Sequence, residues 1–212
     1  MTPRFVLASA SPARLRILQQ AGLDPVVVVS GFDEDSVTAP TPRALASQLA
    51  AAKARAVAAR ERDALVLGCD SVLDVDGLAY GKPATPDAAR DHLLFMAGRS
   101  GILHTGHCLL AVRGGEVVAE ALDTGSTTVH FGKPDPAEID AYVASGEPLE
   151  VAGGFTLDGY GGWFMTGIEG DHGTVLGLSL PLLRQLLRLL DIQVTDLWRP
   201  AKLSEGRRAA LD

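Results

Sequence analysis

Two serines and an arginine stand close together near the start of the chain, in the stretch LASASPARLRIL. Ser11 followed by Pro12 is a typical helix start, with the serine as N-cap and the proline at the first helical position. Arg14 then lies in the first turn, where its charge opposes the helix macrodipole and costs about 0.3–1 kcal/mol. A bound anion would reverse that sign, because exposed amides, the Ser9 and Ser11 hydroxyls and the guanidinium would face it. The stretch predicts a phosphate site; an ordinary capped helix with a solvated arginine is the alternative.

A lysine interrupts an apolar stripe on the predicted helix 42–60. Lys53 follows Leu49 and precedes Val57 at spacings of four, so the three side chains share one helix face. An ammonium group there needs water, a carboxylate or a phosphate as its partner. Lys53 is therefore a second candidate for binding an anion, and a lysine that snorkels to solvent is the alternative.

Asp70 ends the apolar run ALVLGC. A carboxylate at the end of a buried strand is typical of metal ligands and general bases, although many such aspartates only cap a loop. A three-residue turn at 75–77, with Gly77 left-handed, would make Asp70 and Lys82 cross-strand neighbours. A two-residue turn would instead put the two side chains on opposite faces unless a bulge intervened. A structural salt bridge is the alternative to a functional pair.

Other polar residues give weaker signals. Glu34, in the acidic loop GFDED, is a candidate second carboxylate for a metal, with a solvated loop as the alternative. His104 and His107 point to opposite faces of a strand, so we expect no zinc site there. The glycines of 153–162 do not separate a strand from a helix, and no P-loop motif is present, so neither a dinucleotide fold nor a P-loop is supported.

The elements that must position these residues alternate between helix and strand, which predicts an α/β fold with a mixed sheet flanked by helices. We predict strands over 4–8 and 25–30, helices over 12–21, 42–60, 86–97, 136–145 and 179–190, a hairpin over 64–80 and a long hairpin over 101–131 that turns at 114–115. Residues after about 199 are polar, and we expect them to be frayed.

Composition narrows the class of protein. The 212 residues carry a net charge of −7, which argues against a general basic surface for polymeric nucleic acid. Cys69 and Cys108 lie in apolar runs without a C-x-x-C spacing, so reduced core thiols and the cytoplasm are expected. Neither a signal peptide nor an apolar run long enough to span a membrane is recognisable.

The same residues resemble motifs of the Maf family, also called septum formation inhibitor proteins, whose members are nucleoside triphosphate pyrophosphatases. The resemblance rests on separated motifs in one order: LASASPARLRIL, the FDE of 32–34, LAAAKARAV, LGCDSV, YGKP, AGRSG, YVASGEPLEVAGGFTLDGYGG and VLGLSLPLL. It implies one domain over 1–199 with a tail over 200–212. The implied fold is an elongated mixed sheet with two lobes around a cleft, similar to inosine triphosphate pyrophosphatases. A homodimer is also implied.

The resemblance also implies roles for individual residues. Phosphate contacts fall to Ser9, Ser11, Arg14, Lys53 and Lys82. Asp70 is the implied proton acceptor, and Asp70 with Glu34 would hold a divalent cation, Mg²⁺ or Mn²⁺. Ala13 replaces a second arginine that many members have. Asp158 stands where members that prefer uridine and thymidine triphosphates carry glutamine, and the subgroup that prefers 7-methyl-GTP has an acidic residue nearby, so Asp158 is a candidate for reading the base.

We therefore expect an enzyme that hydrolyses a nucleoside triphosphate, standard or modified, to a monophosphate and pyrophosphate. A nucleotide-binding regulator of cell division without strong catalysis is one alternative. A phosphatase that releases orthophosphate is the other.

Overall fold

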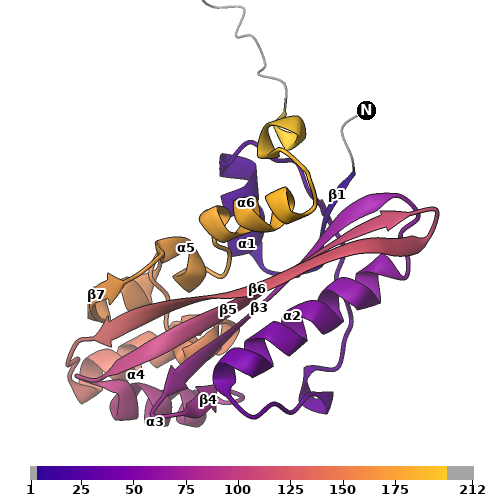
Figure 1. The fold of residues 1–212 in the computed structure, drawn as a ribbon. Coiled ribbons are helices and arrows are strands. Elements are labelled where there is room, and N and C mark those ends of the chain that lie inside the picture. The colour runs from indigo at the N-terminus through magenta and orange to yellow at the C-terminus, as the bar shows by residue number, and fades with distance from the viewer. Residues whose placement is uncertain (1–3, 200–212) are drawn as a thin grey trace, which may run out of the picture.

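The computed structural model describes residues 4–199, and within them seven strands form one mixed sheet (Figure 1). The strands are β1 (Phe5–Leu7), β2 (Val26–Val27), β3 (Ala64–Val75), β4 (Leu78–Tyr80), β5 (Ser100–Arg113), β6 (Glu116–Phe131) and β7 (Met165–Glu169). Their order is β2-β1-β3-β5-β6-β7, and β4 pairs with β3. β1 runs parallel to β2 and β3, whereas the remaining pairs are antiparallel.

Helix starts follow one local rule in this chain. The longer helices are α1 (Pro12–Gln20), α2 (Pro42–Ala58), α3 (Pro86–Met96), α4 (Pro136–Ala144) and α6 (Leu180–Leu189), and α5 (His172–Val175) is a single turn. Each of the five longer helices has a Ser, Thr or Asp N-cap whose side chain accepts from a backbone amide, and a proline in its first two positions. Capping satisfies an amide that has no partner within the helix, and proline loses nothing at these positions, so the sequence specifies each start locally.

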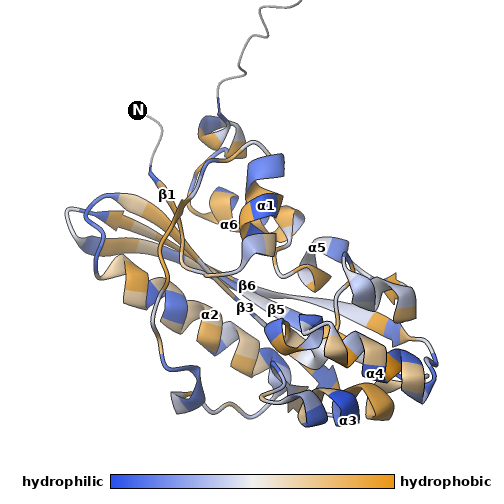
Figure 2. Ribbon diagram, turned by 180° about the vertical axis from the view of Figure 1, so that it is seen from behind, coloured by the Kyte–Doolittle hydropathy of each residue, from blue (hydrophilic) through white to orange (hydrophobic). Residues whose placement is uncertain are grey.

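The two faces of the sheet carry separate cores. On one face, Leu67 of β3 packs with Leu18 of α1 and Leu186 of α6. On the other face, Val66 packs with Ala54 and Val57 of α2. Figure 2 shows hydrophobic β1 passing between these helices, with α1 and α6 on one side and α2 on the other. The alternation of β3 residues between two apolar layers explains its continuous apolar sequence.

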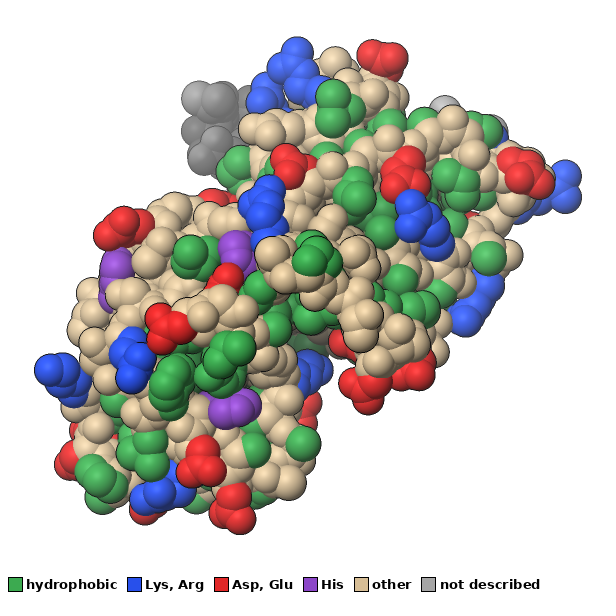
Figure 3. Space-filling model, turned by 60° about the horizontal axis from the view of Figure 1, so that its bottom comes forward, with side chains coloured by type: hydrophobic (Ala, Val, Ile, Leu, Met, Phe, Trp, Pro, Cys, Tyr) green, Lys and Arg blue, Asp and Glu red, His purple; other side chains and the backbone are tan. Residues whose placement is uncertain are grey.

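A third core lies at the opposite end of the long strands. There Leu93 of α3 and Ile139 of α4 pack with Phe131 of β6 and with Phe155 of the glycine-rich segment. The molecule therefore has two lobes on one sheet, one built around β1, α1 and α6 and the other around α3 and α4 (Figure 1). Figure 3 shows the surface indented between the two lobes.

The structure confirms the mixed α/β architecture and the predicted helices and hairpins, with three differences. β2 is only two residues long instead of spanning 25–30, and β7 and α5 were not predicted. Of the two turns considered for the hairpin over 64–80, the structure has the two-residue one, because Val75 pairs with Leu78 and only Asp76 and Gly77 form the turn. Both turn residues have positive φ (55° and 82°), as the common two-residue hairpin turn requires. The expected tail over 200–212 lies outside the described residues.

No helix within residues 4–199 is long and apolar enough to cross a membrane.

Candidate functional site

One edge of β3 has a gap in its strand pairing. β5 occupies one side of β3 from Ala64 to Asp74, so β1 and β4 must share the other side. On β3, the pairing with β1 extends as far as Leu67, and the pairing with β4 begins at Leu73. Residues 68–72 of β3, here called the edge gap, therefore have no strand neighbour on that side. The predicted carboxylate Asp70 lies in the middle of this gap.

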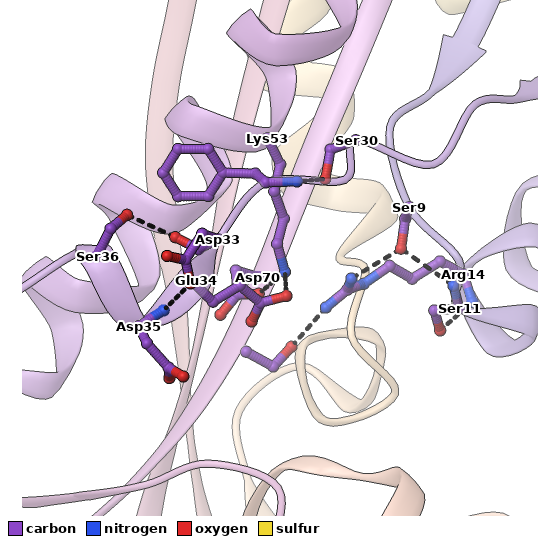
Figure 4. Close-up of polar contacts among 12 residues, drawn as sticks. Ser9, Ser11, Arg14, Ser30, Asp33, Glu34, Asp35, Ser36, Lys53 and Asp70 are labelled. Atoms are coloured by element: carbon purple, nitrogen blue, oxygen red, sulfur yellow. Dashed lines mark hydrogen bonds and ion pairs between the residues drawn. The ribbon is translucent and has the colours of Figure 1, made fainter.

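A buried ion-pair cluster lies on the α2 side of the edge gap. The Lys53 ammonium binds Oδ1 of Asp70 and also lies 2.7 Å from Oε1 of Glu34. Lys53 is 9% exposed and Asp70 is 6% exposed, whereas the Glu34 side chain is half-exposed. Figure 4 shows the lysine reaching from α2 to both carboxylates. Lys53 therefore does not snorkel to solvent; its charge is held inside the molecule by two acidic side chains.

Two glycines in the strands bring α2 close enough for this cluster. A Cβ atom on Gly68 would lie 2.3 Å from the carbonyl oxygen of Ala50, and one on Gly106 would lie 2.3 Å from that of Ala46. The backbone of α2 thus rests directly on β3 and β5, because any larger residue would push it away. Asp70 faces the same side as Gly68, so the close approach places Lys53 over it.

Arg14 approaches the edge gap from α1. Its guanidinium donates to Ser9 Oγ at 3.0 Å, to Ser71 Oγ at 3.1 Å and to the Gly177 carbonyl oxygen at 2.8 Å. Ser11 caps α1 as predicted and accepts from the Arg14 amide. Arg14 is only 9% exposed, so the solvated arginine of the alternative interpretation is wrong. In Figure 4, Arg14 and Ser9 lie across one opening from Lys53 and Asp70.

Burial controls the electrostatics of the gap. Burial raises the pKa of Asp70, while the positive charges of Lys53 and Arg14 oppose the rise. A carboxylate with a raised pKa is a stronger base than an exposed one, which suits proton transfer. The neighbouring Cys69 thiol is fully buried, and burial raises its pKa to about 12. Cys69 is therefore a neutral core thiol and not a nucleophile.

Lys82 does not form a cross-strand pair with Asp70, as expected for a two-residue turn. β4 ends at Tyr80, and the two-residue turn shifts the register, so within residues 4–199 no hydrogen bond or ion pair joins the two side chains. Lys82 is exposed and lies two residues after Tyr80, which pairs with Leu73 next to the gap. The Gly153 amide donates to the Gly81 carbonyl at 2.9 Å and so fixes the residues that directly follow β4, here called the exit of β4. Asp158, the candidate base reader, forms an ion pair with Arg16 of α1.

His104 and His107 contact different partners on opposite faces of β5. The Ser179 amide donates to Nε2 of His107 at 2.9 Å, so we assign the ring proton to Nδ1, which lies 2.9 Å from the Thr105 carbonyl. Burial lowers the pKa of His107 to about 4, so the ring is neutral and anchors the start of α6. His104 contacts Asp74 and Ser126.

Two polar residues of the site region were not predicted from the sequence. Ser71 accepts a hydrogen bond from Arg14. In the sequence, only the position of Ser71 directly after Asp70 pointed to a role in the site. Glu147 shapes the glycine-rich segment: its carboxylate accepts from the Tyr160 and Gly161 amides, each at 3.0 Å, and from the Thr156 hydroxyl. A Glu that follows Gly146 in a loop gives no sign of such convergence, because its partners lie up to fourteen residues away.

Comparison with known proteins identifies the family. Residues 4–190 match the model of the Maf-like protein family. The nucleoside triphosphate pyrophosphatase of Nocardia farcinica is 57% identical over 212 residues, covering 95% of this chain and 100% of that protein. That of Streptomyces coelicolor is 58% identical over 208 residues, with the same coverage. Among solved structures, the Staphylococcus aureus Ham1 protein aligns with a TM-score of 0.44 and 16% identity over 61% of this chain and 72% of that one. The chain belongs to the Maf-like protein family.

Proposed function

We propose that this protein hydrolyses a nucleoside triphosphate between the α and β phosphates, giving a nucleoside monophosphate and pyrophosphate. One observation carries the proposal: a buried carboxylate, Asp70, lies in an edge gap between two buried cations, Lys53 and Arg14, that come from separate segments. The curated relatives bear the name of this activity. Arginine and lysine side chains bind phosphate oxygens through charge-assisted hydrogen bonds, as recognition of a triphosphate tail requires.

The cations would bind the phosphates and stabilise the charge that develops during cleavage. Arg14 offers a planar fork already oriented by Ser9 and Ser71, and Lys53 offers a point charge. Lys82, which is exposed and follows β4, would complete the set. Loss of one such electrostatic contact typically lowers the rate by about 10²–10³-fold.

Asp70 would accept the proton of the attacking water. Lys53 binds its Oδ1, so we assign Oδ2 to the water. The proton moves from water to Asp70 as the new bond to phosphorus forms, and pyrophosphate leaves with the bridging oxygen. The raised pKa of Asp70 favours this transfer near neutral pH.

A divalent cation, Mg²⁺ or Mn²⁺, fits these residues as a partner shared with the substrate. Within residues 4–199 no group of three or more acidic, His or Cys side chains could hold a metal, but Asp70 and Glu34 converge on one ammonium group. Mg²⁺ commonly takes one or two carboxylates together with substrate oxygens and waters. When bound, it would supply charge neutralisation and a lower pKa for water. Direct ligation by Asp70 and the role of Asp70 as base are alternatives.

Two further parts of the proposal concern assembly and location. The family resemblance implies a homodimer, and a nucleotide substrate implies the cytoplasm. Sedimentation and fractionation of the native protein test these parts separately from the chemistry.

Product analysis tests the proposed reaction. The wild-type protein is incubated with a panel of standard and modified nucleoside triphosphates and Mg²⁺ or Mn²⁺, and the products are separated. We expect monophosphate and pyrophosphate, and a loss of kcat of at least about 10²-fold in Asp70→Asn with the fold intact. Orthophosphate as the product would identify a phosphatase, and bound but uncleaved nucleotide would identify a regulator; either result contradicts the proposal.

A further inference from the structure

Two walls border the edge gap, and each is tied down by its own contacts. α1 forms the first wall and carries Arg14, whose guanidinium is fixed by three hydrogen bonds. The second wall is the segment 150–162 together with the exit of β4. The Gly153 amide binds the Gly81 carbonyl, and a Cβ atom on Gly154 would lie 3.2 Å from Pro83, so the two parts of this wall lie in contact.

One side-chain pair joins the two walls directly. Nη2 of Arg16, on α1, lies 3.3 Å from Oδ2 of Asp158, in the second wall. The two residues are 142 positions apart in the chain. Arg16 lies only two residues after Arg14, and Asp158 lies between Thr156 and Tyr160, which Glu147 binds. The pair therefore links α1 to the glycine-rich segment, which in turn contacts the chain after β4 at Gly81.

The pair has the properties of a reversible contact. The side chains of Arg16 and Asp158 are 60% and 48% exposed, so water and salt screen their attraction. Exposed pairs of this kind change an equilibrium by about two- to fivefold at most. Such a contact can bias the position of a wall without locking it, and a substrate can still enter.

We infer that Arg16 is a positioning residue for nucleotide binding, acting through Asp158 to hold the second wall against α1. This inference rests on the proposed function. The nucleotide must contact both walls at once if its phosphates meet Arg14 and Lys82. An ion pair that holds the walls at their binding distance lowers KM, because less ordering remains when the substrate binds. It does not touch the reacting atoms, so kcat is nearly independent of it.

The test combines kinetics with hydrogen exchange of the full chain. The variants are Arg16→Gln, Asp158→Asn, the double variant and Arg16→Lys. Arg90→Gln is the matched control, because Arg90 and Asp140 form another exposed ion pair, at 2.6 Å, that joins α3 to α4 within one lobe. KM and kcat are measured with the triphosphate that wild type cleaves best, and amide exchange is followed in the peptide that covers 155–162.

We expect Arg16→Gln to raise KM about two- to fivefold while kcat changes less than about twofold. Exchange of the 155–162 peptide should become faster, and Arg16→Lys should restore most of both properties. In the Asp158→Asn background, Arg16→Gln should have no further effect on KM. Arg90→Gln should match wild type in all three measurements.

Two results would overturn the inference while leaving the proposed function in place. The first is an Arg16→Gln variant that still releases pyrophosphate and whose KM and amide exchange in the 155–162 peptide equal those of wild type. The second is additive effects of Arg16→Gln and Asp158→Asn on KM, which would mean that the two residues act independently. A wild-type protein that releases no pyrophosphate contradicts the proposed function instead, and the exchange measurement still decides whether the pair holds the wall.

Discussion

Replacement of Gly68 by alanine tests how the site is assembled. The added Cβ would lie 2.3 Å from the Ala50 carbonyl oxygen and 2.7 Å from the Ala54 amide nitrogen, both backbone atoms of α2. Since neither atom belongs to a flexible side chain, α2 must withdraw by at least about 0.7 Å to restore a 3.0 Å contact. Overpacking of this kind typically costs about 1–3 kcal/mol of the free energy of unfolding. Each kcal/mol lowers Tm by roughly 2–4 °C in a chain of this size.

The same movement carries Lys53 away from Asp70. A misplacement near 1 Å can lower a rate by about 10²-fold, so we expect a loss of that order in kcat that exceeds what the fall in Tm explains. Thermal unfolding and steady-state kinetics at 25 °C measure the two effects. Gly167→Ala is the control, because its Cβ would meet only His130 Cδ2 at 3.9 Å. Wild-type Tm and kcat in Gly68→Ala would refute the close packing of α2 on β3.

Two further predictions concern titrating carboxylates. Burial raises the pKa of Asp70 above 3.8, so kcat/KM should fall with decreasing pH around a midpoint above that value. The charge of Lys53 opposes this rise, so Lys53→Gln should move the midpoint to higher pH. A shift of the midpoint to lower pH would contradict the assignment of Asp70 as the base. Burial alone would raise the pKa of Glu147, but hydrogen bonds from Thr156, Gly161 and Tyr160 outweigh it, so the pKa lies below 4.5. The ionised Glu147 carboxylate therefore stabilises the fold above pH 4.5, and this contribution is lost as the pH falls through the lower pKa of Glu147 in the folded protein. Glu147→Gln should destabilise the fold by about 2 kcal/mol at pH 7 and by less at pH 3, as urea unfolding would measure; an equal loss at both pH values would contradict this reasoning.

The sequence identifies the site residues better than it identifies their contacts. Lys53 lies within an apolar helix stripe, and Asp70 ends an apolar strand run. A charged residue at such a position disagrees with the pattern around it, and this can be recognised from the sequence alone. Their mutual contact is not visible, because it depends on which part of α2 lies over β3. Gly68 and Gly106 set that position, and glycine in a strand signals a close approach without naming the partner.

The sequence alone leaves the cross-strand pairing of Asp70 with Lys82 undecided. It depends on a three-residue turn, whereas the Asp76-Gly77 dipeptide favours a two-residue turn with both φ angles positive. One residue of register moves a side chain to the other face of a strand, so a small error in the turn changes every pairing beyond it. The ion pair between Arg16 and Asp158 was equally out of reach, because it joins residues 142 positions apart on two different lobes.

The most direct measurement of the central claim is a crystal structure with a nucleoside triphosphate analogue whose α–β bridge resists cleavage. We expect phosphate oxygens in the edge gap within hydrogen-bonding distance of Arg14, Lys53 and Lys82, with the α phosphorus beside Asp70. A triphosphate bound elsewhere on the surface, with the Lys53 and Asp70 pair undisturbed and no phosphate near Arg14, would contradict it.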